Sequence, residues 1–252
     1  MPRAVLFDVD GTLAETERDG HRVAFNQAFE ALQVPWRWDE AAYGELLSVA
    51  GGRERLLHDM QHRSAAPVAT GEREALAASL HRLKNDHYAR IVRRGELPLR
   101  PGIVALMADC QAAGVAIGIA TTTTGANVDA LLTFHLGAAW RGRFAAVVCA
   151  EDAPRKKPDP QVYELALRAL ARPAHEVVAI EDSPAGVEAA RRAGLSVIVT
   201  RSCYFPATGH PEALAAGPSL GQPEGWHPRA RAGVERIDLE QIVQWRATAA
   251  YP

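Results

Sequence analysis

The chain has 252 residues, of which 48% are hydrophobic and 23% charged, and its formal net charge is −2. This ordinary globular composition gives no electrostatic reason to expect a nucleic acid or a membrane surface as partner, and no apolar run approaches the roughly 20 residues of a membrane span. The three widely spaced cysteines favour reduced thiols over a disulfide frame or a zinc site. We therefore expect a soluble cytoplasmic protein, by default a monomer.

Short apolar runs predict β-strands, and they occur at residues 4–10, 115–121, 145–152, 177–182 and 195–200. The runs are continuous rather than alternating, which is typical of strands in a parallel sheet that is covered on both faces. Helix start signals follow several of them, including Asp159-Pro160 and Ser183-Pro184. This alternation of strands and helices predicts an α/β fold with a doubly wound parallel sheet.

The segment after the first strand does not follow this alternation. Helical periodicity, without a convincing strand, is found at residues 20–34, 39–50, 52–62 and 72–92. We expect residues 15–94 to form an all-helical domain inserted into an α/β core made of residues 1–14 and 95–252. Residues 201–233 are rich in Gly, Pro and Ala, and they are expected to be a long surface excursion that is ordered only in part.

Polar residues stand at the ends of the predicted strands. They are Asp8 and Asp10 after the first strand, Thr121 and Thr122 after the second, Lys157 in the loop after the third, and Glu181 and Asp182 after the fourth. In open α/β sheets, ligands bind outside the carboxyl ends of the strands, so these side chains are expected to converge. Carboxylates, hydroxyls and a lysine suit a hard divalent cation and a phosphoryl group.

The segments "DVDGT", "KP" and "ED", with a Thr at the end of the second strand, resemble in order and spacing the four motifs of the haloacid dehalogenase superfamily. The resemblance covers almost the whole chain, including a helical cap after the first motif. It implies a phosphatase in which Asp8 attacks phosphorus and forms an aspartyl-phosphate. Asp10 then serves as general acid and base, and Lys157 neutralises charge on the phosphoryl group and Asp8.

The same resemblance implies a Mg²⁺ ion held by Asp8, the main-chain carbonyl of Asp10 and Asp182. Glu181 is either a further ligand or a partner bridged through water, and the residues leave this choice open. Thr121 and the backbone N–H of Thr122 are expected to hold phosphate oxygens.

The cap segments resemble those of the β-phosphoglucomutase branch. "GGRER" resembles the cap loop whose arginine grips the non-reacting phosphate, and "LKNDHY" resembles the segment with a substrate-contacting lysine, here Lys84. Two departures weaken an interpretation as a mutase. Thr124-Gly125 stands where the mutase has Lys-Asn, and one extra residue precedes His21, a further candidate substrate contact.

The sequence of the cap is more similar to that of the CbbY-type phosphatases. These enzymes remove phosphate from xylulose-1,5-bisphosphate, an inhibitor of Rubisco in the Calvin cycle. This resemblance implies four specificity residues and one contact to the distal phosphate: Glu17, Tyr43, Gly52 and Arg53, with Arg141 as the contact. A phosphorylated sugar is the expected partner. The alternatives are a mutase, a phosphoglycolate or general phosphosugar phosphatase, and, in another class, a non-catalytic phosphate-binding regulator, against which intact Asp8 and Asp10 argue.

Overall fold

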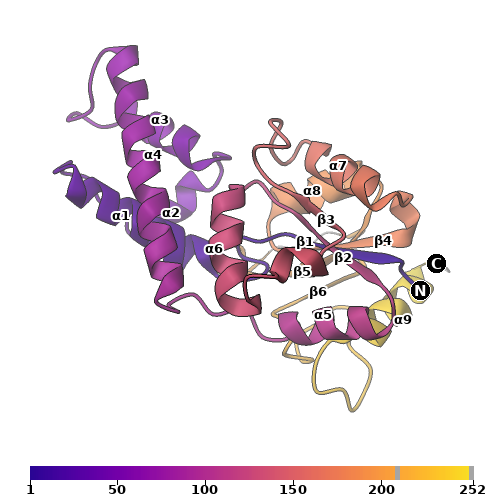
Figure 1. The fold of residues 1–252 in the computed structure, drawn as a ribbon. Helices are drawn as coiled ribbons and strands as arrows, with labels where there is room; N and C mark the ends of the chain where they lie inside the picture. The colour runs from indigo at the N-terminus through magenta and orange to yellow at the C-terminus, as the bar shows by residue number, and fades with distance from the viewer. Residues whose placement is uncertain (208–210, 250–252) are drawn as a thin grey trace.

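The computed structural model describes residues 1–207 and 211–249. Its sheet has the strand order β3-β2-β1-β4-β5-β6, and all neighbours are parallel (Figure 1). The strands are β1 (Ala4–Phe7), β2 (Ala116–Ala120), β3 (Ala146–Val148), β4 (Val177–Glu181), β5 (Ser196–Thr200) and β6 (Ala215–Gly217). The predicted α/β fold with a parallel sheet is therefore confirmed.

Helices cover both faces of the sheet, and β1 shows why the strands read as continuous apolar runs. Val5 and Phe7 point into one buried cluster, and Ala4 and Leu6 into another on the opposite face. The first cluster includes α5 (Ile103–Ala112), α6 (Gly125–Leu136) and α9 (Leu239–Ala249), and the second includes α7 (Gln161–Leu170) and α8 (Pro184–Arg192). The sheet is doubly wound, with α7 and α8 on one side and α5 and α9 on the other (Figure 1).

The segment expected to be a surface excursion contributes to the core, which corrects the expectation for its described residues. β6 joins the edge of the sheet beside β5, and Leu220 and Trp226 are only 1% and 4% exposed. The Trp226 ring lies so close to Gly217 that a Cβ there would stand 2.1 Å from it, so the strand accepts only glycine at this position. Residues 208–210 of the expected excursion lie outside the described residues.

Residues 17–93 contain helices and no strand among the named elements. They are a π-helical turn η1 (Glu17–His21), α1 (Arg22–Ala31), α2 (Glu40–Leu46), α3 (Gly52–Met60) and α4 (Thr70–Arg93). These helices enclose an aromatic core of their own around Phe25 and Trp38, while Tyr88 and Ile91 of α4 belong to the same buried cluster as β1. The helical segment, called the cap below, thus stands beside the sheet with α4 next to α6 (Figure 1). No described helix combines the length and hydropathy needed to cross a membrane.

The two chain crossings between cap and core lie side by side, and Arg100 fastens them. Ala14 and Leu99 form an isolated antiparallel bridge at this place. The buried Arg100 guanidinium donates to main-chain carbonyls of several core segments: Gly11, Thr200 at 3.0 Å, Arg201 at 2.6 Å and Pro218 at 2.6 Å. Since Gly11 directly follows Asp10, this guanidinium also holds the loop that carries Asp10.

Replacing Arg100 with methionine is expected to lower the free energy of unfolding by about 3–5 kcal/mol, because the substitution leaves buried carbonyls without donors. Urea denaturation measures the loss. Arg236→Met is the matched control, because Arg236 makes a two-pronged pair with Asp109 at 2.7 and 2.8 Å but is one-third exposed. That control should lose about 1 kcal/mol or less, and equal losses in the two variants would contradict the anchoring role.

Candidate active site

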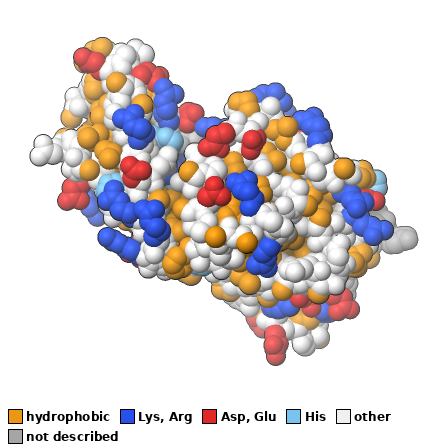
Figure 2. Space-filling view, viewed as in Figure 1, with side chains coloured by type: hydrophobic (Ala, Val, Ile, Leu, Met, Phe, Trp, Pro, Cys, Tyr) orange, Lys and Arg blue, Asp and Glu red, His pale blue; other side chains and the backbone are white. Residues whose placement is uncertain are grey.

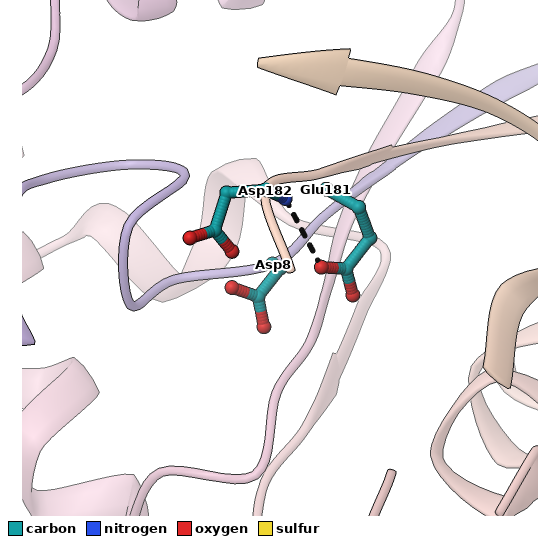
Figure 3. Close-up of side chains that lie close together, drawn as sticks. All are labelled: Asp8, Glu181 and Asp182. Carbon is teal, nitrogen blue, oxygen red and sulfur yellow. Dashed lines mark hydrogen bonds between the residues drawn. The ribbon is translucent and has the colours of Figure 1, made fainter. Parts of the chain in front are cut away.

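Three carboxylates meet where β1 and β4 end. The two strands are paired in parallel with Phe7 opposite Ile180, so Asp8 lies beside Glu181, and Asp182 follows (Figure 3). One carboxylate oxygen from each of the three residues lies within 4.8 Å of the others, and all three side chains are buried. The register of the parallel sheet therefore makes the acidic cluster.

Lys157, from the loop after β3, neutralises part of this charge. Its Nζ donates to Asp8 Oδ1 at 2.6 Å, to Glu181 Oε1 at 2.7 Å and to the Ala120 carbonyl at 3.0 Å. Burial disfavours the charged lysine, but the Asp8 and Glu181 carboxylates outweigh burial and hold the pKa of Lys157 above its usual value. Lys157 therefore stays cationic where a phosphoryl group would meet Asp8.

The cluster carries more negative charge than one lysine offsets. Burial, together with Glu181 and Asp10, raises the pKa of Asp8 to about 7 although Lys157 opposes the rise. Burial, Asp8 and Glu181 likewise raise the pKa of Asp182 well above its ordinary value. Carboxylate oxygens are the ligands that hard divalent cations prefer, so the residues fit a Mg²⁺ ion.

The three carboxylates of the cluster differ in how many hydrogen bonds they already accept. Glu181 accepts from Lys157 and the Tyr163 hydroxyl through Oε1, and its Oε2 accepts from the Asp182 backbone N–H at 3.2 Å. Asp8 accepts from Lys157 through Oδ1, and the Asp182 carboxylate has a side-chain hydrogen bond with Ser202. Both Glu181 oxygens are thus engaged by protein donors, one of them Lys157, whereas Asp8 and Asp182 are the cluster members better placed to offer oxygens to a metal.

Asp10 lies at the edge of the cluster, in a different environment. Its Oδ1 accepts from Thr16 Oγ1 at 2.6 Å and from His21 Nε2 at 3.0 Å. Burial alone would raise the pKa of Asp10, but the charge of His21 and the hydrogen bonds from His21 and Thr16 hold it well below its usual range. The structure thus separates the first-motif carboxylates into a buried one with a raised pKa and one that is held ionised.

Two cavities lie between cap and core, and five residues, here called the shared wall, line both of them. The first, here called the reaction cavity, is lined by Asp8, Lys157 and Asp182 and has a volume of about 380 Å³. The second, the distal cavity, has a volume of about 230 Å³ and includes the cationic residues Arg53, Lys84 and Lys156 in its lining. The shared wall consists of Asp10, Glu17, Gly51, Arg55 and Thr122. Figure 2 shows the notch between the two lobes, with basic side chains beside it.

Among the expected phosphate contacts, Thr122 lines both cavities. Thr121 directly follows β2 and is 1% exposed, and its hydroxyl accepts from the backbone N–H of Thr123 at 3.2 Å. Thr124 caps α6, while the Gly125 N–H donates to Glu151. The loop after β2 is thus shaped by its own capping bonds, with Thr122 at the cavities.

Most of the expected cap residues surround the cavities. His21, Gly52, Arg53 and Lys84 line the distal cavity, and Glu17 stands in the shared wall. Lys84 is buried between the rings of Phe25 and Tyr88, and burial lowers the pKa of Lys84 to about 8. Arg53 forms an ion pair with Glu74 and is half-exposed.

Tyr43 is buried behind this wall and donates its hydroxyl proton to Glu17. Arg141 is not brought to either cavity: it lies on the short helix η2 (Trp140–Arg143), is 56% exposed, and pairs with Asp129 at 3.3 Å.

Two residues at the cavities were not expected from the sequence. Lys156 donates to Glu54 of α3 at 2.9 Å, which joins the core to the cap across the distal cavity, and Arg55 lies in the shared wall. No local pattern indicates the role of Lys156, because its partner Glu54 is 102 positions away in the sequence. The acidic residue after Arg53 and the second arginine in "GGRER" are the only local signals that could have indicated either role.

Gly186 supports the site from α8 and offers a test. A Cβ at this position would stand 2.0 Å from Glu181 Oε2, so Gly186→Ala must displace the carboxylate that orients Lys157. We expect a loss of about 1–3 kcal/mol in the free energy of unfolding and a fall in phosphate release beyond what unfolding explains. Gly71→Ala, where nothing lies within 4 Å of the added Cβ, is the control: it should not lower the free energy of unfolding and should leave phosphate release unchanged.

Comparisons with known proteins place the chain in a family. A profile of the haloacid dehalogenase-like hydrolases matches residues 2–194. The chain is 43% identical over 245 residues to protein CbbY of Cupriavidus necator, which covers 96% of both. A crystal structure of a CbbY variant from Rhodobacter sphaeroides in complex with xylulose-(1,5)bisphosphate is 40% identical with a TM-score of 0.81, over 89% of this chain and 97% of that chain. A phosphoglycolate phosphatase of Yersinia pseudotuberculosis is 31% identical, over 88% of this chain and 94% of the relative.

Proposed function

Since the chain belongs to the haloacid dehalogenase-like hydrolases and is a phosphatase of that family, we propose that it hydrolyses a sugar bisphosphate, specifically xylulose-1,5-bisphosphate, with the help of Mg²⁺. The observation that carries this proposal is the pair of cavities with a shared wall. One cavity holds Asp8 and Lys157, and the other holds cationic side chains but no second nucleophile site of this kind among the described residues. A molecule with a phosphate at each end fits this distribution of charge.

In the proposed reaction, an Asp8 carboxylate oxygen attacks phosphorus while the bond between phosphorus and the sugar oxygen breaks. Asp10, once it has gained a proton in the complex with substrate, gives that proton to the departing oxygen, and it later takes a proton from the water that attacks the aspartyl-phosphate and releases phosphate. Lys157 stabilises the negative charge of the phosphoryl oxygens, and Thr121 and Thr122 orient them. Mg²⁺, held by Asp8, Asp182 and the Asp10 carbonyl, would supply further neutralisation of charge.

The proposed domains are a core of residues 1–14 and 95–252 and a cap of residues 15–94. The separate aromatic core of the cap supports this division. The two chain segments that connect cap and core lie side by side, because Ala14 and Leu99 form an antiparallel bridge. The Lys156–Glu54 ion pair joins the two parts over the distal cavity. We propose that closing excludes water from the first step and opening admits it for the second.

Phosphate release from xylulose-1,5-bisphosphate and from ribulose-1,5-bisphosphate, each with Mg²⁺ and with a chelator, tests the proposal. These sugars differ in the configuration of one carbon, so a general phosphatase should barely separate them. We expect strong preference for the xylulose compound and no release in the chelator. Equal rates would leave a general phosphosugar phosphatase, faster release from phosphoglycolate would favour that substrate, and binding without release in Mg²⁺ would indicate a regulator.

A further inference from the structure

Arg55 contacts three segments of the cap, although no sequence pattern indicated a role for it. From α3 its guanidinium donates to Glu17 Oε1 at 3.2 Å and Oε2 at 3.3 Å, and to the Tyr43 hydroxyl at 3.0 Å. Its Nε donates to the Val49 carbonyl at 3.0 Å, and the guanidinium lies 5.5 Å from the centre of the Tyr43 ring. Arg55 therefore ties together η1, α2 and the loop before α3, and it is only 9% exposed.

Resting on the proposed function, we propose that Arg55 is a positioning residue for substrate selection, which holds the Glu17 carboxylate in the wall shared by the two cavities. Glu17 and Arg55 both line the reaction cavity and the distal cavity. A substrate that places its two phosphates in the two cavities must pass its middle atoms along this wall. Those atoms carry the hydroxyl groups by which sugar bisphosphates differ.

The chemistry of a fixed carboxylate explains how this wall selects. An ionised carboxylate only accepts hydrogen bonds and has about four lone-pair positions, of which Arg55 and Tyr43 fill three at Glu17. The remaining capacity suits a hydroxyl donor from the sugar. Because a partly buried carboxylate is stable only where donors face it, the guanidinium is needed to hold Glu17 in place.

A second consequence concerns the neighbouring charges. Glu17 and Asp10 both belong to the shared wall, so a Glu17 carboxylate without its partners would add a second unbalanced negative charge there. The two carboxylates have different partners. Asp10 accepts from His21 and Thr16, whereas Glu17 accepts from Arg55 and Tyr43. Selection and proton transfer are thus assigned to different acids that line the same space.

The test compares two substrates in a double-mutant cycle made of Arg55→Lys, Glu17→Gln and the double variant. Xylulose-1,5-bisphosphate carries hydroxyls along the wall, and p-nitrophenyl phosphate carries none. For Arg55→Lys we expect the ratio of the two kcat/KM values to fall by about 10- to 100-fold, as for the loss of hydrogen bonds to a charged group. The double variant should be no worse than Glu17→Gln alone, because Arg55 acts through Glu17.

Arg63→Met is the matched control, since Arg63 pairs with Asp59 at 2.6 Å in the cap but lines neither cavity. It should lower stability without moving the substrate ratio. Equal losses on both substrates in Arg55→Lys, or additive losses in the double variant, would show that Arg55 is merely structural and overturn the inference. A wild-type protein with no preference for the sugar bisphosphate over the aryl ester would instead refute the proposed function and this inference with it.

Discussion

Asp8→Asn is expected to abolish phosphate release, with kcat falling on the order of 10⁴-fold or more, because the amide oxygen is too weak a nucleophile to form the covalent acyl phosphate. The side chain keeps its size, and its carbonyl oxygen can still accept from Lys157 Nζ, which lies 2.6 Å from Asp8 Oδ1. The measurement is steady-state phosphate release, together with acid-quenched detection of labelled phosphate on the protein. Neither should rise above background in the variant.

The stability of Asp8→Asn shows whether the variant loses activity because its chemistry fails or because it unfolds. Asp8 is one of three buried carboxylates beside a single lysine, and burial with its acidic neighbours raises its pKa to about 7. In metal-free buffer above that pH, removing this charge relieves repulsion, so the unfolding midpoint of Asp8→Asn should be no lower than that of the wild type. Asp129→Asn, at an exposed carboxylate outside both cavities, is the control and should keep full activity. Covalent labelling of Asp8→Asn would contradict the assignment of the nucleophile.

The sign of this pH effect follows from the direction of the shift. A carboxyl group whose pKa is raised on folding is penalised for ionising in the folded state, so it costs stability once the pH passes its unfolded value. Between pH 4 and pH 7 the wild type should therefore lose stability relative to Asp8→Asn as the pH rises, using the ordinary value of 3.8 and the raised value of about 7. Chelator must be present, since a bound divalent cation would favour the ionised form.

The parts of the active site that the sequence predicted are those that local patterns specify. Asp8, Thr121 and Glu181 each stand at the end of a buried apolar run, and a parallel sheet brings such ends to one edge whatever the lengths of the connections between them. The order of the strands in the sheet decides only which of these three residues lie next to each other. The acidic cluster could therefore be inferred before any contact was known.

The parts that the sequence did not predict depend on pairs that are distant along the chain or on weak local patterns. Lys156 and Glu54 are 102 positions apart, and Arg55 reaches Glu17 across 38. β6 has the sequence Ala-Ala-Gly, which lacks the β-branched and aromatic residues typical of strands. Its place in the sheet depends on the Trp226 ring that covers Gly217, a contact that no periodicity reveals.

Asp10→Asn is expected to keep substrate binding within about threefold and to lower kcat by about 10²–10⁴-fold, the usual contribution of a general acid and base. The amide oxygen can still accept from Thr16 and His21, so the loop should keep its shape. Calorimetric titration with the substrate measures binding, and phosphate release measures turnover. Asp19→Asn is the control, because Asp19 pairs with Arg18 nearby and lines neither cavity.

The two proton transfers can be told apart by the leaving group. The aryloxide of an aryl phosphate leaves without needing a proton. Formation of the aspartyl-phosphate from this substrate should therefore continue in Asp10→Asn, and the intermediate should accumulate. A sugar phosphate needs the proton, so its first step should slow and little aspartyl-phosphate should form. Because His21 and Thr16 hold the pKa of Asp10 well below its usual range against the effect of burial, the base of the second step is the role that this arrangement favours most directly. The acid role additionally requires Asp10 to gain a proton once substrate is bound, and equal losses on the aryl and sugar esters would leave Asp10 as the base alone.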